Sequence, residues 1–488
     1  MNRSNPDGND RSKSGSGFLQ LDLGSGPGGR TDRLTAELRA AVLDGRLPAG
    51  SALPASRTLA GELGVSRGVV TQAYQRLTQD GLVAGRGRAG TVVLDTRAAR
   101  AGLPERSRQP PQFVAAPDVE AFEGFRTAPS TVDLSPGSPD LSAFPRVAWL
   151  RAERAVLQEL SPTDLGYGNA AGAAPARAAI AGWLGRYRGI GVGPDRIVVT
   201  SGVAQALALL ARVLHRQGID TIAVEDPGSL GARQQLQNWG LTTVPVPVDD
   251  LGLRVDRLAA TGARAVLLTP AHQFPTGVVL DPGRRRDLLE WAAGGGLIIE
   301  DDYDAEHRYD RAPVAALASL LPEQTCYAGS VSKTLAPALR MGWLVVPERL
   351  QASVVAAKRD ADLGSSVLGQ LALARLMGSG ELERHLRAVG RRHRRRRDAM
   401  IGALHRYLPE ARIHGAAAGL HVTVTLDPGV DDIMWARAAF EEGVKVTPLS
   451  WHRLRPGRPG LVLGYAAVSE GEIDTAIAVL GRLLTSPH

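Results

Sequence analysis

The sequence predicts an α/β protein in which a mostly parallel sheet fills the larger, C-terminal part, preceded by a small helical domain with its own core. At 488 residues with 44% hydrophobic content, the chain exceeds one ordinary domain and can bury sizeable cores. Residues 34–93 carry a compact pattern of short helices. Further on, apolar strand-like runs alternate with Ala- and Leu-rich helical segments, which is typical of a parallel sheet. These runs cover residues 196–200, 221–225, 265–269 and 297–300.

Composition limits the classes of protein that fit. The net charge of +7 favours a polyanionic partner, although an arginine-rich composition also follows from genomic base content. Cys326 is the single cysteine, which excludes an internal disulfide framework and indicates a reducing compartment. The polar N-terminus lacks the apolar core of a signal peptide, and no run reaches the roughly 18 apolar residues of a membrane span. We therefore expect a disordered tail over residues 1–24 and a soluble, cytoplasmic protein that involves neither a membrane nor a metal.

The small N-terminal domain is expected over residues 25–93. Leu34, Leu38 and Val42 recur at four-residue spacing, which marks the buried face of one helix. A turn rich in glycine and proline follows, and Ser56 is the expected N-cap of a short second helix. Two helices joined in this way need a third to complete a core.

The third helix completes a helix-turn-helix. Ser66 follows a tight turn and is expected to cap it. Arg67, Thr71 and Gln75 lie at four-residue steps and project from the side opposite its apolar residues. A short turn between two helices, the second with a polar face, is the plan of a DNA-reading motif.

A β-hairpin is predicted after this helix, over residues 82–93, with Arg86 and Arg88 at its tip. Residues 53–60, 63–67 and 73–77 together with this hairpin resemble the GntR-type winged helix. The resemblance implies that Arg57, Arg67 and Thr71 approach double-stranded DNA, and that Gly90 lets the wing backbone come close to it. The alternative is a small helical cap with solvated arginines. Gly68 and Val69 stand where the family often has polar residues.

Residues 94–130 are predicted to form a linker, because they carry scattered arginines, paired prolines and little apolar periodicity. The second and larger domain is expected over residues 131–488, with a smaller α+β subdomain from about residue 375. Within that subdomain a run of arginines, residues 391–397, continues a helical pattern that starts at residue 382. It is interpreted as a solvated or interface helix; the alternative is a nucleic-acid contact.

The sequence around Lys333 gives the clearest indication of the chemistry of the large domain. This lysine lies among hydroxyls and small residues between two apolar runs. Burial lowers an amine's pKa and exposes its lone pair, so such a lysine can condense with an aldehyde. Ser330, Ser332 and Arg340 could hold an anion beside it. An aldehyde with a phosphate that fits is pyridoxal 5'-phosphate; the alternative is an ordinary surface lysine.

A second segment supports the cofactor. The apolar run at 297–300 ends in Asp301, with Tyr303 two residues later, and parallel sheets place ligands beyond the carboxyl ends of their strands. A carboxylate there keeps a pyridine nitrogen protonated, and a phenol can bond the ring's 3-oxygen. Asp301, Tyr303 and the Ser-x-Ser-Lys run ending at Lys333 resemble the fold-type I aminotransferases, and specifically the MocR/GabR family of bacterial regulators.

The resemblance implies further contacts with the cofactor. Gly202 and Val203 match a phosphate-binding turn that leads into a helix, where backbone amides meet an anion. Tyr167 resembles the tyrosine that these enzymes send across a homodimer interface to the partner's phosphate. Phe274 occupies the position of the usual asparagine, so His272 or Gln273 would replace it at the ring 3-oxygen.

Two departures from the family pattern bear on catalysis. Ser229 stands where an aromatic residue usually stacks on the pyridine ring. Val462 replaces the arginine that clamps the substrate carboxylate, which removes both binding and orientation. Arg453, Arg455 and Arg458 lie just upstream and are candidates to compensate.

These features predict a transcriptional regulator rather than a working enzyme. Lys333 would hold pyridoxal phosphate as a Schiff base, and a vitamer or an amino compound would act as effector by favouring one of two conformers. The alternative is an active aminotransferase with an appended DNA-binding domain, since Lys333, Asp301 and Tyr303 suffice for the chemistry in principle. A third alternative is a DNA-binding protein that has lost the cofactor.

Overall fold

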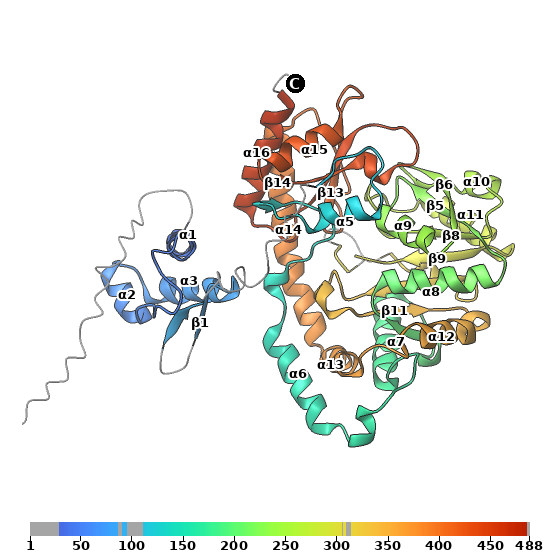
Figure 1. Ribbon diagram of the computed structural model, residues 1–488, viewed down its shortest axis with the longest axis horizontal. Helices are drawn as coiled ribbons and strands as arrows, with labels where there is room; N and C mark the ends of the chain where they lie inside the picture. The colour runs from blue at the N-terminus through green and yellow to red at the C-terminus, as the bar shows by residue number, and fades with distance from the viewer. Residues whose placement is uncertain (1–28, 86–89, 95–110, 305, 309–313, 486–488) are drawn as a thin grey trace, which may run out of the picture. The chain divides into compact units, whose positions relative to one another are not determined.

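The computed structural model describes residues 29–85, 90–94, 111–304, 306–308 and 314–485 (Figure 1). The chain divides into two compact units, residues 1–109 and 110–488. The tail expected over residues 1–24 lies outside the described residues, as do Arg86 and Arg88. Each unit is described by itself below.

The N-terminal unit is a helix-turn-helix with a hairpin, as its spacing predicts. Its helices pack through fully buried side chains such as Leu34 and Leu38 of the first helix and Val70 and Leu77 of the third. The Tyr74 hydroxyl donates to the Pro54 carbonyl over 2.8 Å and ties the third helix to the loop before the second. The elements are α1 (Arg30–Leu43), α2 (Ser56–Glu62), α3 (Arg67–Gln79) and the antiparallel pair β1 (Val83–Gly85) and β2 (Thr91–Val93).

The helix caps of this unit differ from those expected. Helix α2 begins at Ser56 itself, because the Leu59 amide already donates to the Ala55 carbonyl, so Ala55 is the N-cap. The Ser56 hydroxyl is instead 3.4 Å from Nε of Arg67, which donates to it. Ser66 is the N-cap of α3 by position, but its side chain makes no capping hydrogen bond.

An eight-stranded sheet forms the centre of the larger unit, in the order β4-β11-β10-β9-β8-β5-β6-β7. All neighbours between β10 and β6 pair in parallel; β11 and β7 are antiparallel to their neighbours, and β4 runs in the direction of β10. This confirms the mostly parallel sheet. The strands are β4 (Ile197–Thr200), β5 (Thr221–Asp226), β6 (Thr242–Asp249), β7 (Gly252–Leu253), β8 (Ala265–Leu268), β9 (Leu297–Asp301), β10 (Thr325–Ser330) and β11 (Gly342–Val345).

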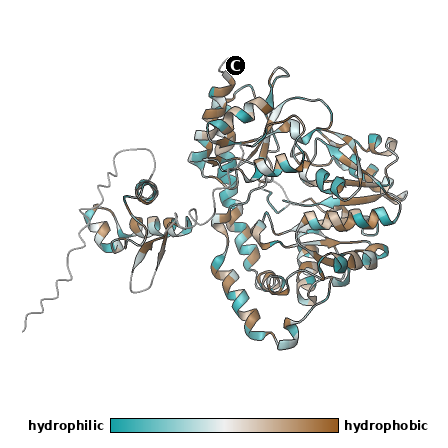
Figure 2. Cartoon of the chain, viewed as in Figure 1, coloured by the Kyte–Doolittle hydropathy of each residue, from teal (hydrophilic) through white to brown (hydrophobic). Residues whose placement is uncertain are grey.

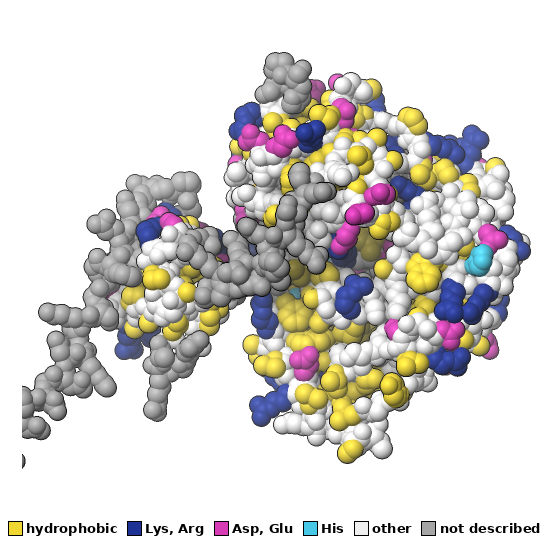
Figure 3. All heavy atoms as spheres, in the orientation of Figure 1, with side chains coloured by type: hydrophobic (Ala, Val, Ile, Leu, Met, Phe, Trp, Pro, Cys, Tyr) yellow, Lys and Arg dark blue, Asp and Glu magenta, His cyan; other side chains and the backbone are white. Residues whose placement is uncertain are grey.

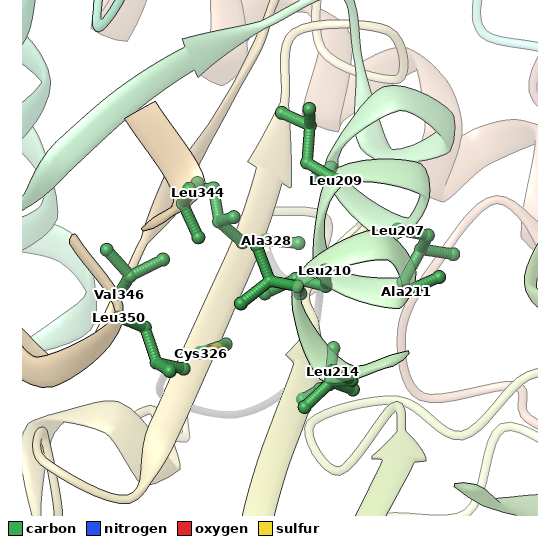
Figure 4. Close-up of a cluster of buried hydrophobic side chains, with 14 of the residues drawn as sticks. Leu207, Leu209, Leu210, Ala211, Leu214, Cys326, Ala328, Leu344, Val346 and Leu350 are labelled. Atoms are coloured by element: carbon green, nitrogen blue, oxygen red, sulfur yellow. The ribbon is translucent and has the colours of Figure 1, made fainter. Parts of the chain in front are cut away.

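Helices cover both faces of this sheet, because successive strand residues point to opposite sides. On β10, Cys326 and Ala328 face the leucines of α8 (Figure 4). Tyr327 belongs to the separate core formed with α7 and α13. Hydrophobic and hydrophilic residues alternate along these helices, as amphipathic packing requires (Figure 2). The helices around the sheet are α6 (Arg146–Glu159), α7 (Ala174–Arg188), α8 (Val203–Arg216), α9 (Leu230–Asn238), α10 (Val255–Ala260), α11 (Pro282–Ala293), α12 (Glu348–Asp362) and α13 (Val367–Gly378).

The C-terminal part forms the smaller α+β subdomain. Its four-stranded antiparallel sheet has the order β12-β13-β16-β15, and a separate two-residue ladder joins β14 to β3. The C-terminal half of the long helix α14 packs Met400, Ala403 and Leu404 against this subdomain core. The elements are α14 (Glu381–Tyr407), β12 (Arg412–His414), β13 (His421–Thr425), α15 (Asp432–Glu441), β14 (Val444–Lys445), β15 (Thr447–Pro448), β16 (Gly460–Gly464), α16 (Glu470–Thr485) and, from earlier in the chain, β3 (Val132–Asp133).

The expectation of a linker over residues 94–130 is wrong in its second half, which contains helix α5 (Val119–Thr127). The Asp118 carboxylate accepts the Ala121 amide over 2.8 Å and starts the helix. Phe125 then packs edge-on against Trp451, with ring centroids 4.9 Å apart. The helix is too short to show a long apolar period, and its packing partner lies over 300 residues later in the chain.

The basic run of residues 391–397 is part of α14, as predicted. Several of its charges are paired within the unit: Arg392 and Arg396 each lie 2.9 Å from the Asp140 carboxylate. On the face seen in Figure 3, lysine and arginine side chains are dispersed among acidic ones. The larger unit thus supports the interpretation of a solvated or interface helix. In the part of the chain that is described, no helix is both long and apolar enough to cross a membrane.

Candidate functional site

A cavity of about 340 Å³ lies at the carboxyl ends of the parallel strands. Asp301 and Ser330 end β9 and β10, and Gly202 follows β4, so strands that run in the same direction bring these residues to one edge of the sheet. The volume suits a small molecule. The residues that line it are Phe122, Phe125, Arg126, Ser135, Pro136, Gly137, Gly202, Val203, Ala204, Ser229, Gly231, Thr269, Phe274, Asp301, Tyr303, Ser330, Ser332, Lys333, Arg340, Thr447 and His452.

Lys333 lies in the wall of this cavity, where the sequence predicts a reactive amine. Its Nζ donates to the Gly137 carbonyl over 2.5 Å. A side chain at Gly137 would be strained by the backbone φ of +84°, and its Cβ would lie 2.9 Å from Nζ, which would have to move. Burial lowers the pKa of Lys333, while the carboxylates of Asp301 and Asp304 oppose that shift. A lowered pKa leaves more of the neutral, nucleophilic amine at neutral pH.

The Asp301 carboxylate has a buried oxygen that lacks a hydrogen-bond partner. Its Oδ1 accepts no hydrogen bond from the residues that the structure describes. Burial, followed by the charges of Asp302 and Asp304, raises the pKa of Asp301 to about 7, and Lys333 acts in the opposite direction. An unpaired buried carboxylate is costly, so its natural complement is a protonated nitrogen on a ligand.

An anion cradle forms the other end of the cavity. Helix α8 begins here, with Gly202 as N-cap and the amides of Val203 and Ala204 unpaired within the helix, which favours an anion. The guanidinium of Arg340 lies beside this helix end: its Nη2 donates to the Ser201 carbonyl over 2.6 Å. Ser330 and Ser332 add hydroxyls.

These three features fit pyridoxal phosphate. The amine of Lys333 suits an aldehyde, the unpaired oxygen of Asp301 suits a pyridine N–H, and the helix end with Arg340 suits a phosphate. The cavity thus brings together the residues that the sequence predicts from three distant segments.

The expected contact of His272 with the cofactor ring is corrected, because His272 is buried beside the cavity and is not among the residues that line it. Its Nδ1 lies 2.8 Å from the Asp304 carboxylate and 3.0 Å from the Tyr303 hydroxyl. The histidine therefore orients Tyr303, which does line the cavity. Ser229 also lines it, and its hydroxyl accepts the Ala232 amide over 3.2 Å, so this residue caps α9 instead of stacking on a ring.

The remaining predicted positions lie elsewhere. Tyr167 is 95% exposed and lines a different hollow, so within one chain it does not reach the cavity. Val462 is fully buried in β16, where it pairs with Thr423 and Thr447. The upstream arginines that were candidates to replace the carboxylate clamp do not line the cavity: Arg453, Arg455 and Arg458.

Sequence reasoning missed the contribution of α5. Phe122, Phe125 and Arg126 line the cavity, from a stretch interpreted as linker. One signal was available, because an aspartate three residues ahead of the Ala121 amide is a helix-start pattern. Nothing local pointed to His452, which also lines the cavity and whose Nε2 has no hydrogen-bond partner among the described residues.

The N-terminal unit carries the second candidate site. Arg57, Arg67 and Thr71 are all exposed on α2 and α3, as the motif predicts. The Thr71 hydroxyl donates to the Arg67 carbonyl over 2.9 Å. Gly90 precedes β2 with φ of +78° and is exposed at the hairpin. The exposed polar side chains of α2 and α3 suit a DNA contact.

Comparison with known proteins agrees with the two domains. The family model described as "Bacterial regulatory proteins, gntR family" matches residues 30–93, and that for "Aminotransferase class I and II" matches residues 129–480. The chain is 32% identical to the probable rhizopine catabolism regulatory protein MocR of Rhizobium meliloti, covering 89% of this chain and 90% of that one. It is 33% identical to the HTH-type pyridoxine biosynthesis transcriptional regulator PdxR of Corynebacterium glutamicum, covering 91% and 94%.

A solved structure gives the same relationship for the larger unit. The α-aminoadipate aminotransferase LysN of Thermus thermophilus, complexed with N-(5'-phosphopyridoxyl)-L-leucine, is 30% identical and superposes with a TM-score of 0.66. The match covers 72% of this chain and 92% of that one.

Proposed function

The chain belongs to the MocR/GabR family, which joins a GntR-type DNA-binding domain to a class I and II aminotransferase domain, and we propose that it is a transcriptional regulator that binds pyridoxal 5'-phosphate. One observation carries the proposal: a helix-turn-helix with an exposed polar face precedes, in the same chain, a cavity that holds Lys333 and the unpaired Asp301. An aminotransferase does not need the helix-turn-helix, and a simple repressor does not need the cavity.

Different residues of the larger unit would bind different parts of the cofactor. Lys333 would supply the amine to which the cofactor attaches, and Asp301 would accept its pyridine N–H. The N-terminus of α8, with Arg340 and the hydroxyls of Ser330 and Ser332, would hold the phosphate. Tyr303, whose hydroxyl lies beside His272, would hydrogen-bond the ring 3-oxygen. When bound, pyridoxal phosphate supplies an aldehyde that combines reversibly with primary amines.

The signal is either the vitamer or an amino compound. A ligand shifts a conformational equilibrium only by its differential affinity for the two conformers. The cavity lies at the junction between the large sheet and the C-terminal subdomain, since Thr447 and His452 line it together with strand ends of the sheet. Occupancy can therefore favour one arrangement of these two parts over another.

A working aminotransferase is the second candidate. The cavity keeps Lys333, Asp301 and Tyr303, which favours this possibility. The absence of an arginine at Val462 opposes it, because nothing in β16 clamps a substrate carboxylate. We rank it below the regulator.

The proposal includes double-stranded DNA as partner, a homodimer and a cytoplasmic location. Arg57, Arg67, Thr71 and Gly90 would contact an operator. A dimer is supported by the apolar side chains exposed on the larger unit and by Tyr167, which is available to a second copy. The exposed residues include Val147, Leu150, Leu157 and Leu165.

The test follows the visible spectrum and DNA binding together. The purified full-length protein is titrated with pyridoxal phosphate and then with primary amines, while binding to DNA from upstream of its own gene is measured. An absorption band that appears with the cofactor alone and changes DNA affinity identifies the vitamer as signal. A response only to amines, without keto-acid release, identifies an amino compound. Steady keto-acid release would favour the enzyme, and absence of any band would exclude the cofactor.

A further inference from the structure

Helix α5 forms one wall of the cavity and is held there at both ends. Before its start, the Gln234 amide donates to the Pro117 carbonyl over 2.9 Å. At its C-terminus, Nζ of the buried Lys445 donates to the carbonyls of Arg126 and Ala128, over 3.3 and 3.0 Å. The backbone of Arg126 therefore has a fixed place at the cavity, although its side chain reaches solvent.

The guanidinium of Arg126 is occupied by a partner that a ligand can replace. It contacts the Glu123 carboxylate through two hydrogen bonds of 2.8 and 2.6 Å, one turn earlier on the same helix. The side chains are 63% and 53% exposed. Exposed pairs of this kind contribute little to stability, so exchanging one carboxylate for another costs little.

The positive charge of Arg126 reaches the reactive amine. Burial is the main cause of the lowered pKa of Lys333, and the charge of Arg126 lowers it further. Both residues line the same cavity. A primary amine that displaces Lys333 from the aldehyde of the cofactor would therefore lie in the same cavity as the charge of Arg126.

The other cations of the cavity already have roles in the proposed function. Arg340 is fixed at the helix end by its bond to Ser201, and Lys333 holds the aldehyde. Among the lining residues, Arg126 is the remaining arginine or lysine. The position that carries the carboxylate clamp in amino-acid aminotransferases is Val462, which is buried in a strand. The cavity thus has an arginine at its mouth where a second anionic group of a ligand would need one.

We propose that Arg126 recognises a carboxylate on the effector by giving up its pair with Glu123. This inference rests on the proposed function and narrows it: the effector class becomes primary amines that carry a carboxylate. The guanidinium fork suits the two carboxylate oxygens. Because α5 belongs to the segment that begins at Pro110, immediately after the N-terminal unit, the contact acts on the part of the larger unit next to the DNA-binding domain in sequence.

The experiment measures carboxylate discrimination in the full-length, cofactor-loaded protein. The probes are ω-amino carboxylates with two to five carbons, each compared with the n-alkylamine of the same chain length. The concentration that half-changes the visible band gives each affinity. We expect the wild type to bind at least one carboxylate about tenfold or more tightly than its matched alkylamine, as a charge-assisted pair allows.

Three variants isolate the arginine. Arg126→Gln should lose the preference, so that each carboxylate binds no more tightly than its matched alkylamine. Glu123→Gln should enlarge the preference, because the competing carboxylate is gone. Arg151→Gln is the control, since Arg151 pairs with Glu381 away from the cavity and its loss should change neither affinity.

Two outcomes would overturn the inference, and they are separable from failure of the cofactor assignment. An Arg126→Gln protein that shows the cofactor band and the full carboxylate preference excludes Arg126 while leaving the proposed function intact. A wild type that shows the band and prefers no carboxylate does the same. A wild type without any band overturns the cofactor assignment and this inference with it.

Discussion

Asp301 and Asp302 are adjacent in sequence and have opposite surroundings. Asp302 is buried on the side of the sheet where Arg188 and Tyr327 both donate to its Oδ2 over 2.6 Å. Asp301 lines the cavity on the other side, and its Oδ1 has no partner among the described residues. The alternation of side chains at the end of β9 thus gives one aspartate a structural environment and the other a vacant hydrogen-bonding position.

Asn substitution should separate these two roles. Asp302→Asn breaks a buried ion pair and should lower the free energy of unfolding by about 3–5 kcal/mol. Asp301→Asn removes a buried charge without a partner and should leave stability within about 1 kcal/mol, while cofactor affinity falls about tenfold or more. Chemical denaturation and cofactor titration of both variants measure the two quantities. Equal loss of stability in both would contradict this assignment.

Lys333→Ala should abolish the visible absorption band of the bound cofactor without unfolding the protein. The chain's lysines are Lys13, Lys333, Lys358 and Lys445, so borohydride reduction followed by peptide mapping identifies the modified residue directly. Lys358→Ala is the matched control, because Lys358 is buried in an ion pair with Asp362, away from the cavity. Retention of the wild-type band by Lys333→Ala would show that another group holds the cofactor.

Lys445→Met should loosen α5. The substitution removes the donor to the carbonyls of Arg126 and Ala128 and leaves Asp133, 2.7 Å away, without its cation. We expect a loss of about 1–3 kcal/mol in the free energy of unfolding. Faster hydrogen exchange should be confined to the amides of residues 119–127, measured by mass spectrometry. Unchanged exchange there would mean that packing of Phe125 on Trp451 suffices.

Glu300 should make stability depend on pH with a negative slope. Burial, then the charge of Asp302, raises the pKa of Glu300 to about 7, whereas an unfolded glutamate titrates near about 4.3. The folded protein therefore holds more protons between these values, so this residue's contribution is complete below about pH 4 and is lost as the pH rises toward 7.

Glu300→Gln removes that term while keeping an acceptor for the amide of Leu317 or Ala318. The difference in unfolding free energy between wild type and variant should change by up to about 1.4 kcal/mol per pH unit over this window. Urea denaturation from pH 4.5 to 8 measures it. Parallel curves for the two proteins would refute the assignment.

Arg67→Ala should weaken DNA binding with a salt signature. If Arg67 contacts a phosphate, its loss reduces the slope of log affinity against log salt by about one; a base contact instead costs about 1–3 kcal/mol and relaxes sequence preference. Arg39→Ala is the control in the same unit, because Arg39 pairs with Asp80 over 2.5 Å. Fluorescence anisotropy at several salt concentrations distinguishes the cases. Equal effects of both variants would indicate a general charge effect.

Much of the fold could be predicted because its signals are local. The spacing of Leu34, Leu38 and Val42 predicts α1, and the apolar runs of the sheet begin and end within a residue of the observed strands. Asp301 ends β9, Lys333 follows the end of β10, and Arg340 precedes the start of the antiparallel strand β11, so the topology of the sheet brings all three to one edge.

The rest of the cavity depends on contacts between distant segments. Phe125 and Arg126 lie in a nine-residue helix whose packing partners, Trp451 and Lys445, come more than 300 residues later. His272 occupies a strand end, as the sequence suggests, and turns toward Asp304 because a buried carboxylate is the stronger partner. The local sequence around α5 or around His272 does not indicate these contacts with distant residues.

The placement of α5 determines where the protein can be divided. A shortened chain that starts at residue 131, where the sequence suggests the second domain begins, would lack Phe122, Phe125 and Arg126 and leave one side of its own cavity open. It would also expose the ring of Trp451 to water. A chain that starts at Pro110 keeps the wall and its contacts. Residues 110–130 thus belong structurally to the larger unit, and experiments on that unit in isolation need to include them.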